Sequence, residues 1–470
     1  MKLSKKQKKD IYTKLIFKDK RSKIIMNEIM INDSISSFID WDSLLEKEVT
    51  FTGMVQNCRV SSWGGFLILR MPNYIVQCVM DRNNLNVKPE DIPVEGSVKV
   101  CGTVKASTIK DKAIHPNNCE IHVKSIEILS KSSLEQLPVD TTKKELNVNI
   151  HTKFDKRPLT LRHPKEQAIF RISSVIFNEF GNFLTDNGFT RICSPKIVKT
   201  GAEGGANIFK LDYFGRDAFL GQSPQFYKQM MVGVFGRVFE EAPVFRAEKH
   251  DTSRHLNEYI SLDIEMMLEN GFMDLIQVET KLLKHIFEKL KEKCSYEIQL
   301  LGIEIPTVDK IVTVEFDEVH EIVFKETGKD YRGEKDLAPE EEALIGEYAK
   351  KNWNTELVFV THYPTIKRPF YTMDDSTKEG RTLSYDLLFR GMEITTGGQR
   401  LNIYEDYLEK MKAFGLTTEL FEGYLQVFQY GMPAHGGFGL GLERLTSLLC
   451  GLQNVKEASL FPRDINRLEP

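Results

Sequence analysis

The chain has 470 residues, of which 41% are hydrophobic and 28% are charged, a composition typical of a globular protein with two or three domains. A net charge of −4 excludes a uniformly basic nucleic-acid binder, and no apolar run reaches the roughly eighteen residues of a membrane span, so we expect no membrane partner. The seven cysteines contain no C-x-x-C pair, which argues against zinc sites and disulfides and indicates a reducing, cytoplasmic compartment.

Residues 1–44 read as a basic N-terminal extension. The lysines and arginines from Lys2 to Lys23 are opposed there only by Asp10 and Asp19. Such an arm could hold a phosphate backbone, or it could be a solvated tail, and the sequence leaves both open. It has no uninterrupted apolar core, so it is not a secretory signal.

Residues 45–131 carry short β patterns separated by Gly and Pro, at 49–60, 65–81, 96–107 and 119–129. Short strands at this spacing predict a small barrel or sandwich. If it is a five-stranded barrel of the oligonucleotide-binding (OB) type, Phe66 would stack on a base and Gln77 would read a base edge, with Arg59 as a third candidate contact. The alternative for Phe66 is a place in the barrel core.

Residues 132–163 have weak periodicity and are expected to be a hinge or linker. From Pro164 the apolar residues recur every three or four positions, which predicts a helix that ends near Gly188. A short strand at 189–192 leads to Ser194 and Pro195. This helix and strand could be a packing unit or a subunit interface, and periodicity cannot decide between them.

The next stretch contains Glu203 before two glycines, a strand at 218–220, and a helix that Pro224 can start. Gln225 and Lys228 are three residues apart on that helix, so they point to the same spot. A lysine is usually a surface residue, but Lys228 follows an apolar strand closely, which favours an inward orientation.

FRAEKHDTSRHLNEYISLDIEM, residues 245–266, predicts a strand that ends at 245–248, a polar loop with Arg254 and His255, and a second strand from Glu258. Apolar and polar residues alternate in the second strand, so one face is core and the other is free for chemistry. Arginines at such a strand end suit a polyanion, because guanidinium binds phosphate or carboxylate through two hydrogen bonds. The alternative is that Arg246 and Glu248 only pair with each other.

Two amphipathic helices are predicted at 273–293 and 339–352, with many acidic residues between them. We expect residues 270–360 to contain a small, solvent-facing insertion that has no site of its own.

Residues 382–400, TLSYDLLFRGMEITTGGQR, predict a hairpin in which Asp386 lies opposite Glu393. Two carboxylates across a ladder repel each other and call for a cation, and oxygen ligands without His or Cys favour Mg²⁺. A solvated edge with two unrelated carboxylates is the alternative. Gly397 and Gly398 allow close approach of a ligand, and Arg400 adds a cation.

The glycine-rich stretch at 435–441 runs into a helix that carries Arg444. Free N–H groups and the positive end of the dipole at a helix start attract an anion, and Arg444 adds a full charge. The stretch is neither the dinucleotide fingerprint nor a Walker loop, because residue 442 is Leu and no G-K-S/T follows.

The order of FRAE with RHLNEY, of GGQR, and of GLGLER resembles the three-motif catalytic domain of class II aminoacyl-tRNA synthetases, and in its details the aspartyl-tRNA synthetases of the archaeal-type branch (class IIb). The resemblance covers about Glu46 to Pro470. It implies an α+β protein: a five-stranded OB-type anticodon-binding barrel, then a catalytic domain at 164–470 with a mainly antiparallel sheet flanked by helices. It also implies a homodimer, with the first motif at the interface.

The resemblance further implies that ATP is a substrate, that Mg²⁺ is the cofactor, and that L-aspartate is transferred through aspartyl-adenylate to tRNA(Asp), with tRNA(Asn) left open. Arg246, Arg444 and Glu393 would be catalytic, and Glu393, Thr396 and Asp386 would bind the metal. The residues implied for aspartate are Glu203, Gln225, Lys228, Arg246, Thr396 and Arg400. Those implied for ATP are Arg246, Ala247, Glu248, Arg254, His255, Leu256, Glu393, Gly441, Leu442, Glu443 and Arg444.

Lys228 and Arg400 favour aspartate over asparagine, because two cations that face an amide remain partly unpaired. An asparaginyl enzyme is nevertheless one alternative. A non-catalytic tRNA-binding paralogue is another, although such proteins usually lose an arginine that this chain keeps. A paralogue that makes amino acids or modifies proteins usually lacks the barrel.

Overall fold

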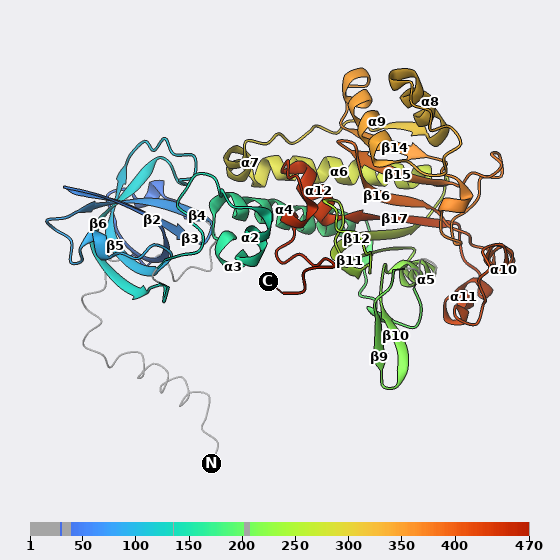
Figure 1. The fold of residues 1–470 in the computed structure, drawn as a ribbon, viewed down its shortest axis with the longest axis horizontal. Helices are drawn as coiled ribbons and strands as arrows, with labels where there is room; N and C mark the ends of the chain where they lie inside the picture. The colour runs from blue at the N-terminus through green and yellow to red at the C-terminus, as the bar shows by residue number, and fades with distance from the viewer. Residues whose placement is uncertain (1–28, 31–38, 135, 202–206, 470) are drawn as a thin grey trace, which may run out of the picture. The chain divides into compact units, whose positions relative to one another are not determined.

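The computed structural model describes residues 29–30, 39–134, 136–201 and 207–469, which form two compact units, Met1–Leu146 and Asn147–Pro470 (Figure 1). The basic arm and Glu203 lie outside the described residues. Among the helices that are described, none is both long and apolar enough to cross a lipid bilayer.

The first unit is a closed barrel of five strands in the order β2-β3-β4-β6-β5, completed by pairing of β5 with β2. The short β1 (Ile29–Met30) runs parallel to β2, and the 3-10 turns η2 (Asp42–Leu44) and η3 (Pro89–Asp91) lie between strands. Alternating apolar residues, such as Val49, Leu67 and Val100, fill the interior. The OB-type barrel is therefore confirmed; its strands are β2 (Glu48–Ser61), β3 (Gly64–Met71), β4 (Tyr74–Asp81), β5 (Ser97–Ala106) and β6 (Cys119–Ser130).

Phe66 is on the outer face of this barrel. Leu67 and Leu69 point into the core. Phe66 directly precedes Leu67 on the strand, so its side chain points outward, where it is half-buried. Arg59 lies opposite Phe66 in the ladder, and Gln77 lies opposite Ile68 on the same face. The core alternative for Phe66 is therefore wrong.

The second unit is built on an eight-stranded sheet in the order β13-β14-β15-β16-β17-β12-β11-β7. The outermost pairs, β13 with β14 and β11 with β7, are parallel and the other pairs are antiparallel, which confirms the mainly antiparallel sheet. A separate small sheet has the order β8-β10-β9. The strands are β7 (Thr190–Arg191), β8 (Ile197–Val198), β9 (Lys210–Tyr213), β10 (Arg216–Leu220), β11 (Arg237–Phe245), β12 (Glu258–Met267), β13 (Val312–Glu315), β14 (Leu357–Thr361), β15 (Ser384–Phe389), β16 (Met392–Gln399) and β17 (His435–Gly441).

Helices flank the sheet, and the largest core cluster joins α4, α6 and α12 to strand residues such as Leu262, Leu387 and Phe438 (Figure 1). The predicted helices at 273–293 and 339–352 are confirmed as α6 and α9. The remaining bounds are α2 (Ile150–Asp155), α3 (Arg157–Thr160), α4 (Pro164–Asp186), α5 (Gln225–Phe235), α6 (Met273–Lys293), α7 (Ser295–Leu301), α8 (Phe316–Thr327), α9 (Pro339–Asn352), η4 (Thr365–Lys367), α10 (Tyr404–Ala413), α11 (Glu422–Gln429), α12 (Leu442–Leu449) and η5 (Val455–Ala458).

Two sequence-based boundaries differ from the structure. Helix α6 places Leu275, Leu282 and Ile286 in the main core, so a solvent-facing insertion cannot begin at residue 270. The acidic residues that suggested exposure lie after α6. The expected linker at 132–163 also contains α2 and α3, which belong to the second unit.

Candidate active site

One cavity of about 370 Å³ lies on the sheet of the second unit. Its walls come from α5, the β11–β12 connection, the β15–β16 hairpin and the β17–α12 junction, segments far apart in the sequence. Most of the residues that the sequence analysis assigned to one site line this single cavity: Gln225, Lys228, Arg246, Glu248, Arg254, His255, Leu256, Glu393, Thr396, Arg400, Gly441, Glu443 and Arg444.

Of the expected site residues that the structure describes, three do not line the cavity. Ala247 lies in the connection after β11, and its backbone N–H donates to the carbonyl of Asn207. The side chain of Leu442 is buried in the main core, which fits the apolar spacing of α12 rather than a ligand contact. Asp386, described below, pairs with Arg368, which does line the cavity.

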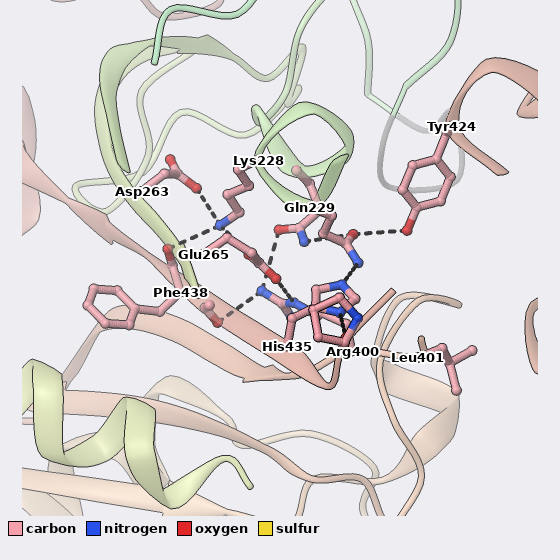
Figure 2. Close-up of polar contacts among 12 residues, drawn as sticks. Lys228, Gln229, Asp263, Glu265, Arg400, Leu401, Tyr424, His435 and Phe438 are labelled. Carbon is pink, nitrogen blue, oxygen red and sulfur yellow. Dashed lines mark hydrogen bonds and ion pairs between the residues drawn. The ribbon is translucent and has the colours of Figure 1, made fainter. Parts of the chain in front are cut away.

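Figure 2 shows the polar contacts of Lys228 and Arg400, which together with Asp263 and Glu265 we call the floor of the cavity. Lys228 is almost fully buried there. Its Nζ donates to Oδ1 of Asp263 at 2.8 Å and to the carbonyl of Phe438 at 3.1 Å, and it lies 3.4 Å from Oε2 of Glu265. Helix α5 brings Lys228 down onto β12, where Asp263 and Glu265 both point to the polar side of the strand. The strand face expected to be free for chemistry is thus the buried floor of a site.

Arg400 completes this floor from the end of β16 (Figure 2). Its Nε donates to Glu265 at 3.0 Å, and one terminal nitrogen donates to the carbonyl of Gly437 at 2.9 Å and lies 3.4 Å from Oε1 of Gln225. Burial raises the pKa of Glu265, but the charges of Arg400 and Lys228 outweigh it and lower that pKa below its ordinary value. Glu265 is therefore ionised and holds both cations in place.

Behind the floor, Gln229 of α5 contacts side chains of three further elements, β17, α10 and α11 (Figure 2). Its Nε2 lies 3.0 Å from Nε2 of His435 and donates to the hydroxyl of Tyr407 at 3.2 Å, while the hydroxyl of Tyr424 donates to its Oε1 at 2.9 Å. Gln225 Nε2 also donates to that oxygen, at 3.0 Å. A buried network of this kind fixes the orientation of α5 and hence of Lys228.

The β15–β16 hairpin turns at Arg390 and Gly391, which both have positive φ, as a two-residue turn of type I′ requires. The predicted hairpin is confirmed, but its expected pairing is wrong. The turn at Arg390 and Gly391 places Glu393 opposite Leu388, and a bulge after Leu387 then places Asp386 opposite Thr396.

The carboxylate of Asp386 is buried and pairs with Arg368 at 2.9 Å. Burial raises the pKa of Asp386 to about 6, against the opposing charge of Arg368, and the nearby Glu393 adds to the rise. The negative charge of Asp386 is therefore balanced by the guanidinium of Arg368. The role of Asp386 as a metal ligand stays a prediction, and Arg368 would compete with the cation for its carboxylate.

Glu393 and Thr396 are better placed for a cation. Both line the cavity, and the hydroxyl of Thr396 donates to Oε1 of Glu393 at 2.9 Å. A carboxylate and a hydroxyl are hard oxygen donors that suit Mg²⁺, which usually takes its other ligands from phosphates and water. No cluster of three or more His, Cys, Asp or Glu residues occurs among the described residues, so a protein cage for a metal is not seen there.

The arginines expected to bind ATP also line this cavity. Arg246 lies 3.9 Å from Glu248, a loose contact that does not remove it from the cavity. Arg444 donates to the carbonyl of Glu393 at 2.9 Å. Arg254 donates to Glu342 of α9 at 2.8 Å, although α9 was expected to have no part in a site.

Burial shifts the pKa values of two further residues in the same cavity, His255 and Glu443. Burial lowers the pKa of His255, so its imidazole is mainly neutral at neutral pH. Both carboxylate oxygens of Glu443 accept from the N–H of Ile260 at 3.1 Å, and burial raises the pKa of Glu443 to about 7. Glu443 thus ties the start of α12 to β12.

Sequence reasoning missed Asp263, Glu265, Glu342, Arg368 and Gln229. Asp263 and Glu265 carried a usable signal, because two acids on the polar side of an otherwise apolar strand call for buried cations. The other three become recognisable only through contacts across more than 15 residues of sequence or between helices.

The fold and this site define a class of protein. The chain matches the model for tRNA synthetases class II (D, K and N) over residues 149–465 and the model for an OB-fold nucleic acid binding domain over residues 49–129. The chain therefore belongs to the class II tRNA synthetases, as the sequence motifs indicated.

Similar proteins narrow the class. The chain is 44% identical to an aspartate–tRNA(Asp/Asn) ligase of Thermus thermophilus, over 86% of this chain and 92% of that relative. It is 37% identical to an aspartate–tRNA(Asp) ligase of Pyrococcus horikoshii, over 91% of this chain and 98% of that relative. Its fold matches the structure of asparaginyl-tRNA synthetase from Pyrococcus horikoshii in complex with asparaginyl-adenylate with a TM-score of 0.84 and 29% identity, over 93% and 100% of the two chains.

Proposed function

We propose that this protein is an aspartate–tRNA ligase that uses ATP to convert L-aspartate to aspartyl-adenylate and then transfers the aspartyl group to the 3′ end of tRNA(Asp). One observation carries this proposal: Lys228 and Arg400 lie at the floor of the same cavity that Arg246 and Arg444 line. Two cations at the floor and two further arginines around the same cavity suit a substrate with two carboxylates next to a triphosphate.

The first step needs positioning and charge neutralisation rather than a proton transfer. An α-carboxylate oxygen of aspartate attacks the α-phosphorus of ATP, a P–O bond forms, and pyrophosphate leaves. Arg246 would neutralise the α-phosphate and Arg444 the far end of the triphosphate, which lets two anions approach each other. Mg²⁺ held by Glu393 and Thr396 would supply further charge to the phosphates. The terminal ribose hydroxyl of the tRNA then attacks the adenylate carbonyl, and AMP leaves.

Selectivity for aspartate rests on the donors at the floor. Lys228 and Arg400 offer only hydrogen-bond donors, so a substrate carboxylate satisfies them while the N–H₂ end of asparagine cannot. Leaving such a buried donor unpaired costs about 2–5 kcal/mol, enough for strong rejection. The second candidate is an asparagine–tRNA ligase, supported by the similar asparaginyl structure and by the acidic partners that Lys228 and Arg400 already have.

The barrel supports tRNA binding. Arg59, Phe66 and Gln77 share its outer face, where Trp63 packs edge-on against Phe66 at 5.4 Å. Gln77 donates to Glu120 at 2.9 Å, so its amide is held at a defined angle. We propose that this face binds the anticodon of tRNA(Asp), and also of tRNA(Asn) if its reading of the third anticodon base is relaxed.

We also propose a homodimer that forms through the first motif. Its strand β7 is the last strand of the large sheet, and the adjoining α4 packs beside it. An edge strand offers unpaired backbone groups to a second copy. The cytoplasmic location stays a prediction from the cysteine pattern.

Amino-acid-dependent exchange of pyrophosphate into ATP tests the first half of the proposal, with aspartate and asparagine compared at equal concentration. Exchange with aspartate and not with asparagine is expected. Exchange with asparagine alone would establish the second candidate, and no exchange with either would support the non-catalytic alternative. Charging of tRNA(Asp) and tRNA(Asn) then decides the tRNA range.

A further inference from the structure

Glu342 reaches the nucleotide side of the cavity from helix α9, in the part of the chain where no site residue was expected. Its Oε2 accepts a hydrogen bond from a terminal nitrogen of Arg254 at 2.8 Å. The two residues are 88 positions apart, and both side chains are largely buried, with exposed fractions of 25% for Arg254 and 13% for Glu342. A charge-assisted hydrogen bond in such a place is stronger than a surface ion pair.

Helix α9 holds Glu342 in a fixed position. Gly346 packs directly on the β15–β16 turn, so closely that a Cβ atom there would lie 2.6 Å from Cα of Gly391. Glu341 accepts from the N–H of Ala338 at 2.9 Å and pairs with the buried His320 at 2.6 Å, which secures the start of the helix. The same turn leads into β16 and Glu393, so α9 and the metal-binding candidate form one packed body.

Arg254, by contrast, lies on the irregular connection between β11 and β12. A side chain on such a segment needs an external partner to keep one orientation. Neighbouring charges also act on Glu342. Burial and the carboxylate of Glu393 raise the pKa of Glu342 to about 7, and the charges of Arg254 and Arg444 oppose this rise. Glu342 is therefore close to Arg254 and also to Arg444, the arginine expected at the far end of a triphosphate.

We propose that Glu342 is a positioning residue that holds the guanidinium of Arg254 ready for the phosphates of ATP. This inference rests on the proposed function, since that function assigns Arg254 to the nucleotide. A fixed Arg254 binds ATP without first losing side-chain freedom, and preorganisation of this kind improves affinity. When a neutral side chain replaces the Glu342 carboxylate, Arg254 is still present but is no longer held in one orientation.

The test compares Glu342→Gln with Glu347→Gln, an exposed glutamate on the same helix that serves as the matched control. Affinity for ATP with Mg²⁺ is measured by titration calorimetry, and pyrophosphate exchange is measured in parallel. We expect Glu342→Gln to weaken ATP binding about tenfold and to raise KM for ATP with little change in kcat, while Glu347→Gln matches the wild type.

A double-mutant cycle separates positioning from a general effect on the fold. In an Arg254→Ala background, Glu342→Gln should weaken ATP binding no further, because its partner is already gone. Equal ATP affinity of Glu342→Gln and the wild type, or fully additive effects in the double variant, would overturn the inference. Because calorimetry needs no amino acid, this result stands even if wild-type exchange with aspartate fails, which would count against the proposed function alone.

Discussion

Replacing Lys228 with Leu removes one partner of a buried, charged cluster. Lys228 lies 2.8 Å from Asp263 and 3.4 Å from Glu265, and Arg400 pairs only with the second of these. The substitution therefore leaves Asp263 without a cation in a place where its carboxylate is 2% exposed. Breaking a buried pair in this way costs about 3–5 kcal/mol, so a measurable loss of stability is expected.

The same change removes a cation from the proposed position of the substrate's side-chain carboxylate. A loss of about 3–5 kcal/mol in transition-state stabilisation corresponds to a fall in kcat/KM for aspartate of roughly 10²–10³-fold or more. Aspartate-dependent pyrophosphate exchange, measured at saturating ATP, reports this loss directly. Thermal unfolding of the same preparations reports the stability change.

The double variant Lys228→Leu with Asp263→Asn separates the two effects. Neutralising Asp263 removes the unpaired buried charge, so most of the lost stability should return. Exchange with aspartate should stay low, because the substrate still lacks its cation. A Lys228→Leu enzyme with normal aspartate exchange, or a double variant with restored exchange, would refute the assignment of Lys228 to substrate selection.

Three further predictions follow from other parts of the molecule. Burial raises the pKa of Glu279 to about 8, above its ordinary value of 4.5, so the folded state keeps a proton that the unfolded state loses between these values. The free energy of unfolding should then fall by up to about 1.4 kcal/mol per pH unit as pH rises through this window, and denaturant melts of Glu279→Gln between about pH 6 and 8 should show a shallower fall. Phe66→Ala should weaken tRNA binding by about 1–3 kcal/mol in a filter-binding assay and leave pyrophosphate exchange unchanged; a loss of exchange would contradict the separate role of the barrel. Arg157 is fully buried and donates to Glu166 and to the carbonyls of residues 457, 459 and 460, so Arg157→Met should lower unfolding stability by about 3 kcal/mol and speed proteolysis of the C-terminal segment, and an unchanged melt would show that these bonds are not needed.

Much of the secondary structure could be predicted because it depends on local spacing. The period of apolar residues predicted the bounds of α6 and α9 and the alternation in β12, which the structure confirms. The motif residues Arg246, Glu393 and Arg444 could be selected because their chemistry and order are readable without coordinates. Their presence around one cavity agrees with that selection.

The sequence by itself determined the long strands and helices, although not the short α2 and α3, and it determined which charged groups are available to the site. Only the tertiary structure decided how those charges are paired. The position of the β15–β16 turn placed Glu393 opposite Leu388 rather than Asp386, and packing of α5 on β12 gave Lys228 two acidic neighbours. Helix α9 likewise brought Glu342 to Arg254 across 88 residues. Local periodicity fixes the direction of a side chain within its own element, whereas electrostatic partners depend on register and on packing between elements that no short stretch of sequence records.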